Sequence, residues 1–208
     1  MLVRQSLYAG IAAPVLFTVV TLAEATARPD YSVTRDLISE LSLTSRGWIQ
    51  ITNFVITGLL LIVFAVGLRA NVRTGPGRVW GPRWVGLAGA CLLAAGVFVT
   101  DPGPGYPPGV EPTTSWHGTV HSIAGPLVFL ALAMTAFTFA RRVARPYGIA
   151  AGVLITTSFA GAGVLTSLDY AGVWSSAPAG LLESLAIHTG LAWLAALAIH
   201  TLRHTFTP

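Results

Sequence analysis

Long apolar runs separated by short polar connections dominate this chain. Six runs reach the length of about 20 residues that a helix needs to cross the hydrocarbon core of a bilayer. They cover roughly residues 6–27, 48–70, 84–101, 115–140, 147–167 and 181–202. Backbone groups in lipid must bond within their own segment, so each run is expected to be a helix. The pattern predicts an all-α, single-domain integral membrane bundle of six transmembrane helices over residues 1–208.

The first connection, residues 28–47, carries a helical pattern of its own. The apolar residues of one face are Val33, Leu37, Ile38 and Leu41, and the polar ones are Arg35, Asp36, Ser39 and Glu40. This spacing predicts an amphipathic interfacial helix in the first outer loop, roofing the bundle. A plain amphipathic connector is the alternative. The Pro- and Gly-rich third connection, 101–109, is expected to be extended.

Composition supports lipid as the outer solvent. The chain is 53% hydrophobic and only 10% charged, whereas soluble domains carry about 25% charged residues. The net charge is +4, and every basic residue other than histidine is an arginine. These arginines lie in short connections between apolar runs, which argues against a nucleic-acid-binding face. With its single Cys91, the chain has no internal disulfide.

The arginines also predict the orientation. Nine of them flank the N-terminus, the second and fourth connections and the C-terminus: Arg4, Arg69, Arg73, Arg78, Arg83, Arg141, Arg142, Arg145 and Arg203. The positive-inside rule makes those segments cytoplasmic, with both termini inside. All eight acidic residues then fall at or near the outer side. The expected location is a bacterial plasma membrane. Cleavage after a signal peptide ending near Ala25-Thr26-Ala27 is the alternative for the first span.

Several polar residues are expected to share the outer third of the bundle. His117 and His121 are one helical turn apart and thus on one face, and Ser184 and His188 repeat that spacing. Three histidines, His117, His121 and His188, suit Zn²⁺ with a position left for water. Asp101 or Glu183 is then the proton acceptor, and Ser184 the hydrogen-bond donor to an oxyanion.

The hypothesis drawn from this set is a metal-dependent hydrolase acting on a lipid or amphipathic substrate. The residues expected to bind that substrate are Arg35, Asp36, Ser39, Glu40 and Asp169. Intramembrane histidines and acids also pair with one another or line proton paths. The alternatives are therefore a non-enzymatic lipid- or ion-binding protein, a proton-linked transporter, and a structural subunit that docks another membrane protein.

The first connection resembles a known family. Arg28-Pro29-Asp30-Tyr31, Arg35-Asp36, Ile38-Ser39-Glu40-Leu41, Gly47-Trp48, Asn53-Phe54 and Gly58 are similar to the family of small prokaryotic membrane proteins called domain of unknown function 998 (DUF998). Asp101, His117 and His121 extend the resemblance. It implies a multi-helix membrane protein and no established reaction. A looser likeness is to intramembrane zinc hydrolases of the alkaline ceramidase type, in site composition alone.

Overall fold

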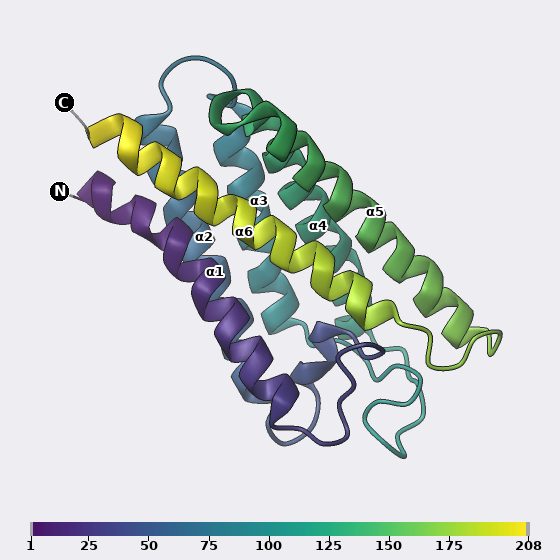
Figure 1. The fold of residues 1–208 in the computed structure, drawn as a ribbon. Helices are drawn as coiled ribbons and strands as arrows, with labels where there is room; N and C mark the ends of the chain where they lie inside the picture. Colours follow the sequence, from purple (N-terminus) through teal and green to yellow (C-terminus); the bar gives the residue numbers. More distant parts are fainter. Residues whose placement is uncertain (1, 207–208) are drawn as a thin grey trace.

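The computed structural model describes residues 2–206 and is all-α across that range. The long helices are α1 (Leu2–Thr26), α2 (Gly47–Asn71), α3 (Trp80–Val97), α4 (Trp116–Val143), α5 (Arg145–Tyr170) and α6 (Ala179–Phe206). A short 3₁₀ helix, η1 (Ile38–Ser42), lies between α1 and α2. Figure 1 shows the six long helices running up and down in one bundle.

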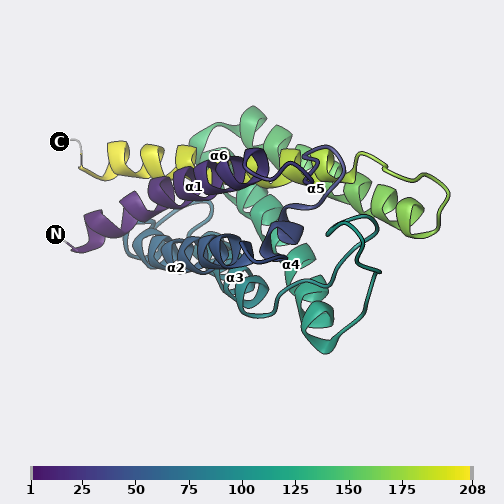
Figure 2. The same cartoon turned by 90° about the horizontal axis from the view of Figure 1, so that it is seen from below.

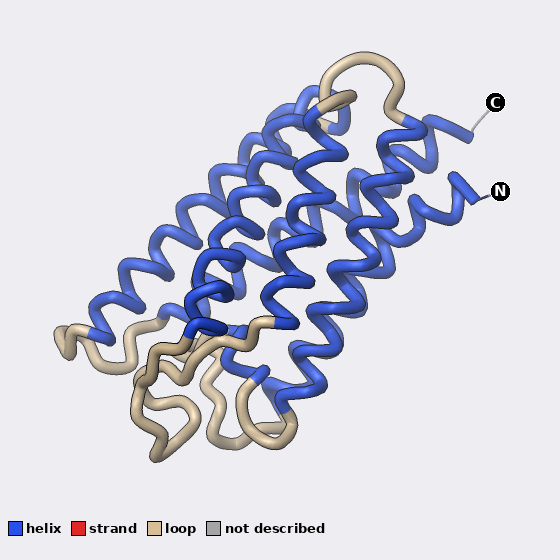
Figure 3. The backbone as a smooth tube through the Cα atoms, turned by 180° about the vertical axis from the view of Figure 1, so that it is seen from behind, coloured by secondary structure: helices blue, strands red, loops and turns tan. Residues whose placement is uncertain are grey.

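The helices close into a ring. Each packs against the next along the chain, and α6 returns to lie beside both α5 and α1. Figure 2 shows α1 beside α6 and α2 beside α3. Figure 3 shows the longer connections gathered at one end. Because successive helices alternate in direction, the connections 27–46, 98–115 and 171–178 all lie at this end. All eight acidic residues lie in or next to these connections. We call this the acidic end.

The opposite end holds both described termini, the connection 72–79 and the break between α4 and α5 (Figure 1). The nine arginines from which the orientation was predicted lie at this end. We call it the arginine end. The segregation of charge between two ends, expected from the sequence, is therefore present in the fold.

Five helices are long and apolar enough to cross a membrane, as expected of a multi-pass membrane protein. They are α1, α2, α4, α5 and α6, and each overlaps a run predicted from the sequence. The run predicted at 84–101 is misplaced. Helix α3 begins at Trp80 and ends at Val97, where the extended backbone of Phe98 terminates it. With 18 residues and Arg83 in its first turn, α3 is not among the five candidate spans.

The outer faces of the bundle are apolar, as lipid contact requires. Large exposed side chains on these faces include Val15, Val19, Val63, Val66, Leu130 and Val164. The interior is filled by fully buried Phe17, Phe64 and Phe139 with leucines around them. Helices α2 and α3 touch through glycine. A Cβ on Gly58 would lie 2.7 Å from the Gly89 carbonyl oxygen, and a Cβ on Gly89 would lie 2.7 Å from the Gly58 carbonyl oxygen. Only glycine permits this backbone approach, which is typical of membrane helix pairs.

The amphipathic helix predicted on the outer surface is wrong in both length and position. Its only helical part is η1, and all five residues of η1 are buried. Residues 31–37 form turns before it. The reason is that Asp36 and Glu40 find hydrogen-bond partners inside the protein. With its polar groups satisfied there, the segment fills the acidic end of the bundle instead of lying on it.

Candidate functional site

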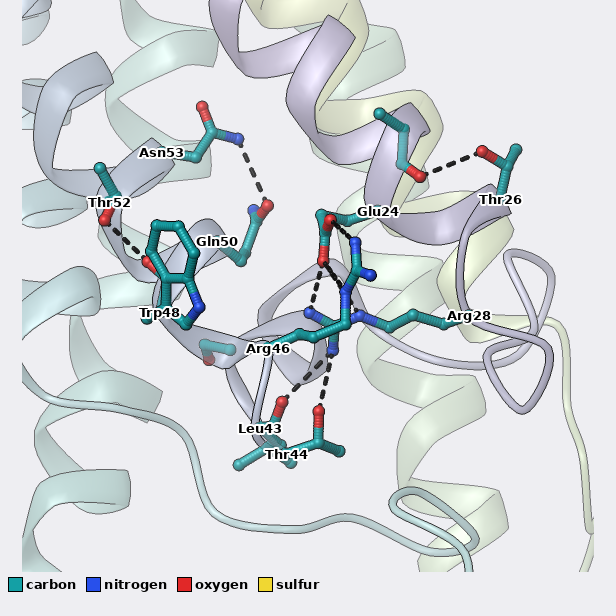
Figure 4. A network of polar contacts seen from close by, with 12 residues as sticks. Glu24, Thr26, Arg28, Leu43, Thr44, Arg46, Trp48, Gln50, Thr52 and Asn53 are labelled. Carbon is teal, nitrogen blue, oxygen red and sulfur yellow. Dashed lines mark hydrogen bonds and ion pairs between the residues drawn. The ribbon is translucent and has the colours of Figure 1, made fainter.

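The two ends of the first connection are fixed to α1 by an ion-pair network. Figure 4 shows Glu24 between two guanidinium groups. Arg28 approaches one carboxylate oxygen of Glu24 at 2.9 Å and Arg46 approaches the other at 2.5 Å. Arg28 also donates to the Tyr106 hydroxyl at 3.2 Å, which ties the third connection to the first. Glu24 and Arg28 are buried, so this pair is an internal clamp.

The middle of the first connection is bonded to the start of α6. The N–H of Gly180 donates to the Arg35 carbonyl oxygen at 3.1 Å, and the N–H of Leu181 donates to Thr34 at 3.0 Å. These are first-turn donors that have no partner within their own helix. The Glu183 carboxylate in turn accepts the N–H of Ile38 at 2.7 Å. The first connection and the first turn of α6 therefore supply hydrogen-bond partners for each other's backbone groups.

Glycine is required at this junction. A Cβ on Gly180 would lie 2.2 Å from the Asp36 carbonyl oxygen, a distance that no side chain tolerates against backbone. The close approach brings residues 34–36 directly over the first turn of α6. It also sets where the side chains of Asp36 and Glu40 point.

Two buried carboxylates result from this arrangement. Asp36 accepts from the Arg35 guanidinium and from the Ser32 N–H, each at 2.8 Å. Glu40 accepts the Leu37 N–H at 2.7 Å through Oε2, while its Oε1 has no hydrogen-bond partner among residues 2–206. Burial raises the pKa of Glu40 to about 8, against the lowering effect of the Leu37 hydrogen bond. Burial also raises the pKa of the neighbouring Tyr31.

A cavity of about 310 Å³ opens beside these carboxylates. We call it the acidic cavity. Its charged and aromatic lining consists of Arg35, Asp36, Glu40, Asp101, Asp169 and Tyr170. The rest includes Leu37, Thr100, Pro104, Ser122, Thr166 and Ala179. The walls thus come from the first and third connections, α4, the end of α5 and the start of α6.

Four of the five residues predicted to bind substrate meet in this cavity: Arg35, Asp36, Glu40 and Asp169. The fifth, Ser39, lines a different cavity inside the bundle. Asp101, predicted as catalytic, joins the four. It also holds Ser115, the N-cap residue of α4, because its two carboxylate oxygens accept the Ser115 N–H and hydroxyl, each at 2.7 Å.

The three histidines predicted as zinc ligands point to different surroundings. His117 is exposed and stacks on Trp116 at 3.6 Å between ring centroids. His121 is buried, and its Nδ1 lies 2.9 Å from the Phe98 carbonyl oxygen. His188 on α6 has its Nδ1 at 2.7 Å from the Ser184 carbonyl oxygen.

The predicted catalytic set is likewise divided. Glu183 and His121 line an interior cavity of about 40 Å³, whereas Ser184 and His188 line another of about 290 Å³ that also contacts α1. Within the described range, 2–206, no group of three or more His, Cys, Asp or Glu side chains is arranged to hold a metal ion. The Zn²⁺ site therefore stays a prediction from the sequence.

Comparison with known proteins identifies the family. A family model described as "Protein of unknown function (DUF998)" matches residues 11–200. The chain belongs to the DUF998 family. The resemblance seen in the first connection is thereby confirmed, and in this DUF998 protein that connection is the segment that fills the acidic end. No curated protein and no solved structure matches the chain.

Sequence reasoning missed three residues that build the site of this DUF998 protein. Tyr170 lines the acidic cavity, and Arg28 joins the first connection to α1 through its ion pair with Glu24. Gly180 allows the backbone of the first connection to approach α6 closely. Arg28 was visible only as part of the family motif. The position of Tyr170, directly after Asp169 at the end of α5, was the one local signal for its role. Nothing in the sequence around Gly180 indicates its contact with a backbone about 145 residues earlier.

Proposed function

We propose that this DUF998 protein binds an organic cation, the protonated amine of an amphipathic molecule, in the acidic cavity and releases it unchanged. The observation that carries the proposal is the lining itself. Four carboxylates and a single guanidinium face one volume of about 310 Å³, a size within the usual range of small-molecule pockets. The excess of negative charge favours a cationic occupant.

The one positive charge in the cavity is already engaged. Arg35 pairs with Asp36 at 2.8 Å and also donates to the Pro104 carbonyl oxygen at 3.4 Å. It therefore neutralises one carboxylate and leaves Asp101 and Asp169 without a countercharge in the lining, next to the carboxyl group of Glu40. An ammonium group that enters between them gains charge-assisted hydrogen bonds, which are stronger than neutral ones.

The uncharged walls favour an organic cation with an apolar part. Leu37, Pro104 and Ala179 supply aliphatic surface. Tyr170 adds an aromatic ring, and a cation over such a ring gains about 0.5–1 kcal/mol at exposed sites. Because Tyr170 is also 56% exposed at the end of α5, an apolar tail can leave the cavity toward lipid.

Glu40 links binding to protons. With its pKa near 8, this side chain is mostly protonated at neutral pH. A cation beside Oε1 favours the ionised form, so binding releases a proton and becomes tighter as pH rises through about 8. Asp36 and Glu183 oppose this ionisation, and Arg35 assists it.

The proposed orientation follows from the arginine end. Positive-inside topology makes that end cytoplasmic, with both termini inside and α3 as a sixth span. The acidic cavity then opens on the outer side of a bacterial plasma membrane. In that position the protein binds amines that arrive from outside or within the outer leaflet.

The test uses the full-length protein in phosphatidylcholine nanodiscs with dansylcadaverine, a fluorescent primary amine, as the probe. We expect saturable binding that tightens between pH 7 and pH 9. Asp169→Asn should weaken it roughly three- to tenfold, because one ion pair of this kind contributes about 1 kcal/mol. Glu40→Gln should remove the pH dependence.

The matched control is Asp30→Asn, which removes an exposed carboxylate from the same connection but outside the cavity. It should leave binding unchanged. The proposal is refuted if Asp30→Asn and Asp169→Asn weaken binding equally. It is also refuted if the N-acetylated, neutral form of the probe binds as tightly as the amine.

A further inference from the structure

A second large cavity lies at the arginine end, far from the site described above. Its volume is about 520 Å³, and it sits between the end of α2, the connection 72–79 and the start of α3. Figure 1 places that connection at the end of the molecule where both termini lie. The cavity is lined by Arg69, Val72, Arg73, Arg78, Val79 and Arg83. We call it the arginine cavity.

The four arginines of this cavity carry no countercharge. All acidic residues lie at the acidic end, so no carboxylate in residues 2–206 pairs with them. Arg73 donates to the Ala70 carbonyl oxygen at 3.2 Å, and Arg83 lies over the Trp80 ring at 5.0 Å. Arg69 and Arg78 are exposed, and their guanidinium groups make no hydrogen bond or ion pair in the described chain. Four uncompensated positive charges around one volume favour an anion.

The connection that presents two of these arginines is held in place from α4. The Arg142 guanidinium donates to the carbonyl oxygens of Thr74 and, at 3.3 Å, Pro76. Gly77 adopts a left-handed φ of 84°, and a Cβ there would lie 2.4 Å from the Phe139 ring. Arg142 is thus a positioning residue, and the loop is packed against the bundle before any ligand binds.

Aromatic residues indicate the depth of this cavity. Trp80 and Trp84 stack with ring centroids 5.8 Å apart at the start of α3, and Trp80 is 57% exposed. Tryptophans in this position lie at the level of lipid headgroups. Val72 and Val79 give the cavity apolar wall as well. Charge, depth and apolar lining together match a lipid headgroup better than a free ion.

We propose that the arginine cavity binds the phosphate of an anionic membrane lipid. Arginine suits this ligand because its planar guanidinium bonds two phosphate oxygens at once. Basic pockets next to membrane helices are a general means of recognising such headgroups. A lipid with two phosphates, such as cardiolipin, matches the four arginines better than phosphatidylglycerol, which has one.

The experiment measures lipid binding to the purified full-length protein by native mass spectrometry in detergent. Cardiolipin, phosphatidylglycerol and phosphatidylcholine are titrated separately. We expect the affinity to follow that order. Each arginine that bonds a lipid phosphate directly contributes about fivefold, so the double variant Arg69→Gln/Arg78→Gln should weaken cardiolipin binding roughly 25- to 30-fold.

The matched control is Arg141→Gln/Arg145→Gln. Both residues are exposed at the same end, lie outside the cavity lining and remove the same total charge. This pair should leave cardiolipin binding within about twofold of wild type. Thermal unfolding of both double variants verifies that they fold. Equal losses in the two pairs would mean that general surface charge attracts the lipid, which overturns the site.

Inorganic phosphate separates a lipid from a soluble ligand. It is added as a competitor at millimolar concentration at constant ionic strength. We expect it to leave cardiolipin bound, because it has no apolar part to contact Val72 and Val79. Full displacement by free phosphate would assign the cavity to a soluble anion and overturn the proposal. Equal affinity for cardiolipin and phosphatidylcholine would do the same.

Discussion

Replacing Glu40 by glutamine is expected to abolish a large pH dependence of stability. Glu40 is buried, only 7% exposed, and its pKa rises from 4.5 to about 8 in the folded protein. The folded state therefore keeps a proton that the unfolded chain loses above about pH 4.5. Because the folded state binds more protons in that interval, the free energy of unfolding falls as pH rises from about 4.5 to about 8.

The size of this effect follows from the shift. A change from 4.5 to about 8 corresponds to about 5 kcal/mol at the usual value per pKa unit. Solvent in the acidic cavity screens the ionised carboxylate, so we expect a loss of about 2–5 kcal/mol by pH 9. Glutamine keeps an oxygen for the Leu37 N–H and cannot ionise. Glu40→Gln should therefore be more stable than wild type at pH 9 by that amount and similar to it at pH 4.5.

The assay is reversible unfolding in mixed micelles, followed by circular dichroism at intervals from pH 4.5 to pH 9. The charges of Asp36 and Glu183 act on Glu40 as well, so the informative quantity is the difference between variant and wild type at each pH. Asp30→Asn, at an exposed position, should run parallel to wild type. Parallel curves for wild type and Glu40→Gln would show that Glu40 is ionised in the folded protein and would refute this reasoning.

Three further substitutions test how the acidic end is assembled, each by the free energy of unfolding in the same micelles. Gly180→Ala places a Cβ against the Asp36 carbonyl oxygen and should cost about 1–3 kcal/mol. Gly172→Ala, in the connection before α6, has a left-handed φ of 67° but open space around it and should cost about 1 kcal/mol. Glu24→Gln leaves the buried Arg28 guanidinium without its anion and should cost about 3–5 kcal/mol. Gly58→Ala should separate α2 from α3 at a cost of about 1–3 kcal/mol, and an unchanged stability would contradict the close contact.

The helices could be predicted because lipid leaves the backbone no alternative. A run such as 48–70 is long and mostly apolar, and the observed α2 differs from it by one residue at each end. The end of α3 could not be predicted in the same way. Val97, Phe98 and Val99 are as apolar as the helix before them, yet Phe98 is extended. Hydropathy measures transfer to lipid, and it does not report where the backbone turns toward a tertiary contact.

The first connection was the hardest part to predict because its structure is fixed by distant partners. Its periodicity is that of an amphipathic helix, but residues 34–38 instead bond to Gly180, Leu181 and Glu183 on α6. Local spacing cannot reveal a donor so far along the chain. The level of a residue along the bundle axis, in contrast, could be predicted from the sequence. That prediction correctly placed Arg35, Asp36 and Asp169 at the same end of the bundle.

Sharing one depth does not place side chains in one cavity. His121 faces the interior from α4, while His188 on α6 lines the cavity against α1. Residues at one level of a helix ring are distributed around its circumference, and the direction in which each points depends on helix rotation. The carboxylates converge because the first connection enters the ring and carries Asp36 and Glu40 toward α5. That insertion, and not the shared level of the histidines, is what creates the acidic cavity.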